Sequence, residues 1–281
     1  MDHALIAFLL TLFAGLCTGI GSLLAFFSKK DNKFLLSFGL GFSAGVMIYI
    51  SFMELLTQSK IMFMTHDHVK MSGWLTTAVF FGGILIAALI DRLIPVFENP
   101  HEIRDGRDLE TIKAPSPKVA DMVACDIPGQ KNRKLARLGI FTAIAIAVHN
   151  FPEGFASFMA SYTNLKLGIP IVIAIAIHNI PEGISVSVPI FCATGNKKKA
   201  FLYSFLSGLA EPLGAVLAYL ILLPFLTHFV MGAIFGIVAG IMVYISFDEL
   251  LPAAREYGEG HTEIWGLITG MVIMAASLNL L

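Results

Sequence analysis

Charged residues are scarce in this chain of 281 residues. They make up 14% of it, whereas hydrophobic residues make up 56%, and a soluble globular domain has roughly 25% charged residues. The shortage of charge nearly excludes a soluble protein. Because about 20 apolar residues cross a bilayer as a helix, this much apolar sequence is enough for roughly eight crossings. The composition therefore predicts a polytopic membrane protein whose surroundings are a lipid bilayer.

The chain also lacks a surplus of positive charge and any cysteine pattern. A formal net charge of −1 gives no basic surface for nucleic acid, so no nucleic-acid partner is expected. The three cysteines, Cys17, Cys125 and Cys192, are an odd number without metal-ligand spacing. Neither a disulfide framework nor a thiolate zinc site is therefore expected, and no resident cofactor is predicted.

Long apolar runs alternate with short polar segments. They predict eight transmembrane helices, at about 4–27, 35–56, 73–95, 135–161, 168–193, 200–223, 229–252 and 263–281. The predicted fold class is an all-α membrane protein in which the whole chain, 1–281, forms one transmembrane domain. The first run is longer than a signal-peptide core and no Lys or Arg precedes it, so it is expected to be retained.

Lysine and arginine are distributed unequally between the two sets of loops. Sixteen follow the first, third, fifth and seventh predicted spans, and three lie on the opposite side. By the positive-inside rule the richer side faces the cytoplasm, which places both termini outside it. The cytoplasmic segment at about 96–134 contains Pro, Asp, Glu and Lys without apolar periodicity, and is predicted to be flexible.

A segment of sixteen residues occurs twice. Residues 41–56 read GFSAGVMIYISFMELL and residues 236–251 read GIVAGIMVYISFDELL, with 11 of 16 positions identical at an offset of 195. The first copy is predicted to run outward and the second inward. We therefore predict an inverted repeat that relates spans 1–3 to spans 6–8 around spans 4 and 5. Such repeats are typical of alternating-access transporters.

A second repeat contains polar residues at mid-membrane depth. HNFPEG at 149–154 and HNIPEG at 178–183 lie near the middle of spans four and five, and Glu211 is equally deep in span six. Ionisable side chains at this depth face a partner or a water-filled path. No Lys or Arg is predicted at this depth, so the glutamates are either protonated or neutralised by a bound cation. The proline of each hexad is expected to kink its helix.

Helical spacing indicates which of these side chains can share an ion. Residues three or four positions apart lie on one helix face, so Glu153 can reach an ion beside His149 and another beside Asn150, and the second hexad repeats this arrangement. Imidazole with carboxylate suits zinc or iron(II), whereas carboxylate with amide oxygen is a harder site. The candidate metal ligands are His149, Asn150, Glu153, His178, Asn179, Glu182 and Glu211.

The two hexads, the GLAEPLG run at 208–214 and the AGIMVYISFDELLP run at 239–252 resemble the ZIP family of divalent-metal transporters, and more narrowly its bacterial zinc transporters. The resemblance covers essentially all the predicted spans. It implies import of Zn²⁺, and also of Fe²⁺, cobalt or manganese, across the bacterial inner membrane. It is compatible with a homodimer.

The resemblance also implies a binuclear site in the translocation path. Carried over by position, the zinc-selective site would use Glu153, His178 and Glu182, with His149 as a further ligand. The second site, associated in the family with iron(II), would use Asn150, Glu153, Asn179, Glu182 and Glu211.

Two other functions share part of this pattern. An intramembrane metalloprotease needs His-Glu-x-x-His, but asparagine follows each histidine, and the Glu-x-x-His of di-iron bundles is absent around both hexads. An enzyme is therefore not expected. A metal channel or sensor would use the same ligands as a carrier, and only the inverted repeat favours the carrier. The coupling ion is left open.

Acidic residues also lie near the ends of two spans. Glu54 is close to the outer end of span two, and Asp248 and Glu249 are close to the inner end of span seven. They are either polar caps at the interface or stations for cations on entry and exit.

Overall fold

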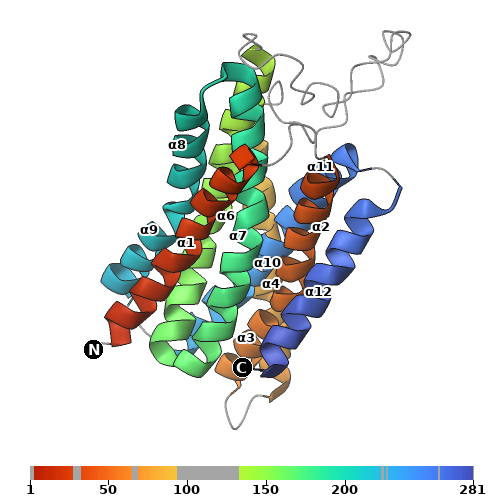
Figure 1. The fold of residues 1–281 in the computed structure, drawn as a ribbon. Helices are drawn as coiled ribbons and strands as arrows, with labels where there is room; N and C mark the ends of the chain where they lie inside the picture. The colour runs from red at the N-terminus through yellow and green to blue at the C-terminus, as the bar shows by residue number, and fades with distance from the viewer. Residues whose placement is uncertain are drawn as a thin grey trace.

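The computed structural model describes residues 3–27, 33–64, 69–93, 133–222, 225, 227–258 and 260–280. These residues form a bundle of long helices, without strands in the ranges just given (Figure 1). The helices are α1 (His3–Phe27), α2 (Lys33–Ile50), α3 (Leu56–Phe63), α4 (Val69–Leu93), α6 (Arg133–Thr163), α7 (Leu165–Thr194), α8 (Lys197–Gly208), α9 (Ala210–Leu217), α10 (His228–Ile245), α11 (Leu251–Tyr257) and α12 (Thr262–Leu280). Three π-helical segments, η1 (Ser51–Leu55), η3 (Ala218–Leu222) and η5 (Ser246–Leu250), follow α2, α9 and α10 directly.

Most of these helices can cross a membrane. Seven helical stretches in the described part of the chain have the length and apolar character that a crossing needs. The remaining long helix is α6, whose 31 residues extend roughly 46 Å at 1.5 Å per residue; it matches the predicted fourth span. The predicted class, an all-α membrane protein, is confirmed.

The predicted boundaries differ most at the second span, which is predicted to end at 56 but continues as helix to Phe63. Polar residues end the apolar run there, but they are satisfied without ending the helix. Gln58 donates to the Glu54 carboxylate over 3.0 Å, and Ser59 donates to the backbone oxygen of Gly232 over 2.7 Å. Most of the predicted cytoplasmic segment, residues 96–132, lies outside the described residues. Helix α6 begins directly after it, at Arg133.

The two copies of the sixteen-residue repeat have the same local structure. Each contains a π-helical segment at the equivalent place, η1 at Ser51–Leu55 and η5 at Ser246–Leu250. The first serine of each segment donates to the backbone oxygen four residues earlier, Ser51 to Met47 and Ser246 to Met242, over 2.7 Å in both. The similarity of the copies therefore extends from sequence to a rare backbone conformation.

The helices form two groups. The hexad bundle consists of α1, α6, α7, α8 and α9, and the repeat bundle consists of α2, α3, α4, α10, α11 and α12. Contacts between the two bundles are made mainly by α2 with α7 and by α6 with α10. Both chain termini lie at one end of the molecule, and the turn between α7 and α8 lies at the other (Figure 1). This arrangement agrees with an even number of crossings.

The cysteines differ from expectation in one respect. Cys17 in α1 is buried and free, whereas Cys192 near the end of α7 is disulfide-bonded. An odd number of cysteines argues against complete pairing, but it does not exclude a single bond.

Candidate metal site

The two hexads lie on the adjacent helices α6 and α7 in the interior of the molecule. Each helix continues through its hexad proline, Pro152 or Pro181. All the predicted ligands are 0 or 1% exposed: His149, Asn150, Glu153, His178, Asn179, Glu182 and Glu211. The structure therefore gathers, in its core, ionisable and amide side chains that are expensive to bury without partners.

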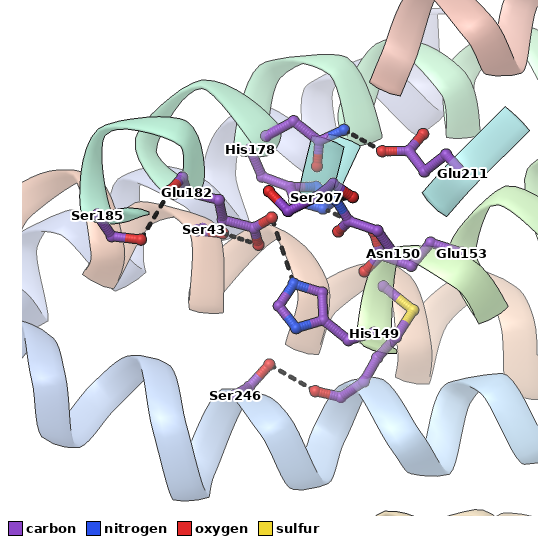
Figure 2. Close-up of polar contacts among 12 residues, drawn as sticks. Ser43, His149, Asn150, Glu153, His178, Glu182, Ser185, Ser207, Glu211 and Ser246 are labelled. Carbon is purple, nitrogen blue, oxygen red and sulfur yellow. Dashed lines mark hydrogen bonds and ion pairs between the residues drawn. The ribbon is translucent and has the colours of Figure 1, made fainter. Parts of the chain in front are cut away.

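The histidines and glutamates form two reciprocal pairs across the helix interface. Nε2 of His149 on α6 lies 3.3 Å from Oε2 of Glu182 on α7, and Nε2 of His178 on α7 lies 3.3 Å from Oε2 of Glu153 on α6. Figure 2 shows the first pair. Spacing along one helix predicts that each glutamate works with the histidine of its own hexad. In the structure each glutamate instead faces the histidine of the other hexad, because α6 and α7 pack against each other.

The ring of His178 is held by its own helix. Its Nδ1 lies 3.1 Å from the backbone oxygen of Ala174. Because a carbonyl oxygen only accepts, Nδ1 carries a proton, and Nε2 is the ring nitrogen that faces Glu153.

The two asparagines are each held through the amide nitrogen. Asn150 donates to the backbone oxygen of Ser207 over 3.3 Å, and Asn179 donates to the backbone oxygen of Ala14 over 2.9 Å. Asn179 also donates to Oε1 of Glu211. With both nitrogens used as donors, the amide oxygens are left to accept.

Glu211 lies where the sixth predicted span is interrupted. That span is not one uninterrupted helix: α8 ends at Gly208, Leu209 is a turn residue, and Glu211 lies in the first turn of α9. The N-terminus of a helix has partial positive charge and favours a carboxylate. Here the effect is small, because Leu209 keeps helical backbone angles and its N–H donates to the oxygen of Phe205, so α8 and α9 are almost continuous.

Several acceptors at this centre have no hydrogen-bond partner among the described residues. They are the side-chain oxygens Glu153 Oε1, Glu182 Oε2, Glu211 Oε2, Asn150 Oδ1 and Asn179 Oδ1, and both ring nitrogens of His149 are likewise without a hydrogen bond. An unsatisfied buried acceptor costs about 1–3 kcal/mol. A cation would satisfy all five oxygens, and the chemistry of these ligand atoms fits an ion that is soft enough for imidazole and hard enough for carboxylate and amide.

The candidate ligand atoms do not surround a single point in this structure. Within the described ranges, no three His, Cys, Asp or Glu side chains form a group that could hold a metal ion. The reason is visible in the pairs above, since the carboxylates are turned toward histidine and hydroxyl partners.

One polar residue of the centre is missed by sequence reasoning. Ser43 on α2 is fully buried, and its hydroxyl donates to Oε1 of Glu182 over 3.1 Å (Figure 2). A signal for it is present in the sixteen-residue repeat, where Ser43 is replaced by Val238 in the second copy. When one copy of a repeat has a polar residue and the other copy has an apolar residue at the equivalent position, the two positions differ in role.

Two cavities that are lined by described residues lie between the bundles, toward opposite ends of the centre. The larger, about 40 Å³, is lined by Ala87, Ile90, Asp91, Val148, Pro152, Ile241, Tyr244, Ile245 and Glu249. The smaller, about 10 Å³, is lined by Val46, Ala174, Ile177, Ile273, Met274 and Ser277. Ile241 and Val46 are equivalent in the sixteen-residue repeat, and Val148 and Ile177 each precede a hexad histidine. The cavities thus occupy corresponding places, and they differ in volume.

Comparison with known proteins gives a consistent result. The family model described as ZIP zinc transporter matches residues 2–278. Zinc transporter ZupT of Campylobacter jejuni is 57% identical over 100% of this chain and 98% of its own length. The protein of the same name from Oceanobacillus iheyensis is 53% identical over the full length of both chains. That from Streptococcus mutans is 56% identical over 99% of this chain and 98% of its own.

Proposed function

Because this chain belongs to the ZIP zinc transporter family, we propose that it imports zinc through the buried histidine, asparagine and glutamate centre of α6, α7 and α9. Family membership makes it a membrane transporter rather than an enzyme. The observation that carries the proposal is the set of buried acceptor oxygens without partners in the described core. Such a set binds a cation in an otherwise apolar bundle.

We further propose that the centre holds two ions. His149, His178, Glu153 and Glu182 form the first site, in which imidazole and carboxylate suit zinc. The second site uses the amide oxygens and Glu211 together with the two shared glutamates, and its harder donors suit Fe²⁺, cobalt or manganese. Proximity supports sharing, because each glutamate lies within 3.3 Å of a histidine of the other helix.

The two unequal cavities support a carrier mechanism. Access to a central site alternates when one bundle moves against the other, and the cavities are the gaps that such a movement would open and close. In this structure α2 lies close against α7, while α6 and α10 border the larger cavity. By the positive-inside assignment the larger cavity faces the cytoplasm. Asp91 and Glu249 line it and would receive a departing cation.

Replacement of the second-site ligands is expected to change metal preference rather than remove transport. Asn179→Asp adds a carboxylate beside Glu211, and Glu211→Ala removes one. We expect zinc uptake into proteoliposomes to stay within about tenfold of wild type, while the ratio of iron(II) to zinc uptake shifts by roughly tenfold, as for a changed ligand environment. An unchanged ratio in both variants would contradict the second site.

Thiol labelling is expected to report the unequal cavities. In a background in which the three native cysteines are replaced by serine, Ala87→Cys lines the larger cavity and Ser277→Cys the smaller one. A water-soluble maleimide should modify the first cysteine several-fold faster than the second. Zinc uptake by both variants serves as the control for folding. Equal rates would argue against a state that is open to one side.

A further inference from the structure

The hydrogen bond from Ser43 to Glu182 joins the two bundles at the candidate metal site. Ser43 lies on α2 of the repeat bundle, and Glu182 lies on α7 of the hexad bundle. The hydroxyl oxygen is 3.1 Å from Oε1 of Glu182, and both side chains are 0% exposed. The other carboxylate oxygen, Oε2, faces His149 at 3.3 Å. Oε1 is thus the oxygen of Glu182 that accepts a hydrogen bond among the described residues, whereas Oε2 has only the contact with His149.

The glutamate of the first hexad has no equivalent partner. Val238 replaces Ser43 in the second copy of the sixteen-residue repeat, and a valine side chain cannot donate. Consistent with this, Oε1 of Glu153 has no hydrogen bond within the described residues. The serine therefore makes the two glutamates chemically different, although their hexads are nearly identical.

We propose that Ser43 is a positioning residue for ion release; this inference rests on the proposed zinc transport. A buried carboxylate needs donors when no cation is bound to it. The Ser43 hydroxyl donates a hydrogen bond to Oε1 of Glu182 when the ion leaves. It therefore competes with the ion for this carboxylate. The same bond holds α7 against α2 when the larger cavity is open, and it breaks when the bundles separate on that side.

The test compares hydroxyl and non-hydroxyl variants in zinc binding and uptake. Ser43→Ala removes the competing donor, so we expect the zinc dissociation constant in detergent to fall and the maximal uptake rate to fall, each by roughly tenfold, the size of one hydrogen bond to a charged group. KM for uptake should fall with the dissociation constant, because tighter binding is coupled to slower release. Ser43→Thr keeps the hydroxyl and should stay within about twofold of wild type on the same reasoning.

Two controls separate the hydroxyl from the space it occupies. Ser43→Val has the shape of the threonine variant without its hydroxyl and should behave like Ser43→Ala. Ser187→Ala removes a buried serine on α7 whose hydroxyl bonds within its own helix, and should leave both constants unchanged. Melting temperatures and size-exclusion profiles confirm that each variant is folded.

Either of two results would overturn the inference. One is a wild-type dissociation constant and uptake rate for Ser43→Ala and Ser43→Val. The other is an equal loss in Ser43→Thr and Ser43→Val, which would mean that space rather than the hydroxyl matters. Failure of the proposed function itself is distinct, because wild-type protein would then show no zinc uptake at all.

Discussion

Glu182→Ala is expected to reduce zinc uptake at least about 100-fold, beyond the 10- to 100-fold loss typical of a residue that only supports a ligand. Glu182 is fully buried, pairs with His149 at 3.3 Å and accepts from Ser43 at 3.1 Å. Alanine removes a proposed shared ligand and leaves both partners unsatisfied. Uptake of zinc into proteoliposomes, measured with an encapsulated zinc-sensitive dye, gives the rate directly.

The matched control is Glu54→Ala. Glu54 is a glutamate of the repeat bundle, in η1, and its carboxylate bonds Gln58 on its own helical stretch. Its loss should reduce uptake far less than the loss of Glu182. If Glu182→Ala transported zinc at the wild-type rate, the hexads would be structural and the proposed path for the ion would be wrong.

Gly183→Val is expected to cause a comparable loss for a different reason. Gly183 follows Glu182 on α7, and a Cβ there would collide with the backbone oxygen of Thr18 on α1. A backbone atom cannot rotate away as a side chain can, so α1 and α7 must separate. Overpacking of this kind costs about 1–3 kcal/mol. We expect a melting temperature lower by several degrees and uptake reduced at least about tenfold, because Glu182 moves with its neighbour.

The control for this substitution is Gly82→Val on α4, where an added Cβ has no atom within 4 Å in the described structure. It should keep the melting temperature and uptake of wild type. Equal effects of the two valines would mean that the close approach of α1 and α7 does not matter for the site.

The membrane fold could be predicted because its signal is local. Each span is an apolar run, and apolar length is what a bilayer selects. Where the prediction was wrong, polar residues ended the run without ending the helix, as at Gln58 and Ser59. The interruption at Leu209 was also missed. It is confined to Leu209, between α8 and α9, and average hydropathy does not record a change at one residue.

The polar side chains that meet in the core could be predicted, but their pairing could not. Glutamate and histidine in an apolar span indicate a site by their burial cost alone. Which glutamate meets which histidine depends on how α6 and α7 pack, and spacing along one helix contains no information about the neighbour. The contribution of Ser43 was missed for the same reason, since it comes from a helix more than a hundred positions away in the sequence.

The two asparagines differ from the other candidate ligands in that they exchange no proton for a metal ion. An amide oxygen binds a cation without first losing a proton, whereas imidazole and carboxylate must be deprotonated. Because backbone oxygens of Ser207 and Ala14 accept from the amide nitrogens of Asn150 and Asn179, the amide oxygens are the atoms left for a cation in the proposed site. If zinc binds at the proposed site, any protons that it displaces come from the histidines and glutamates, so calorimetry in two buffers would count the ligands that were protonated before zinc arrived.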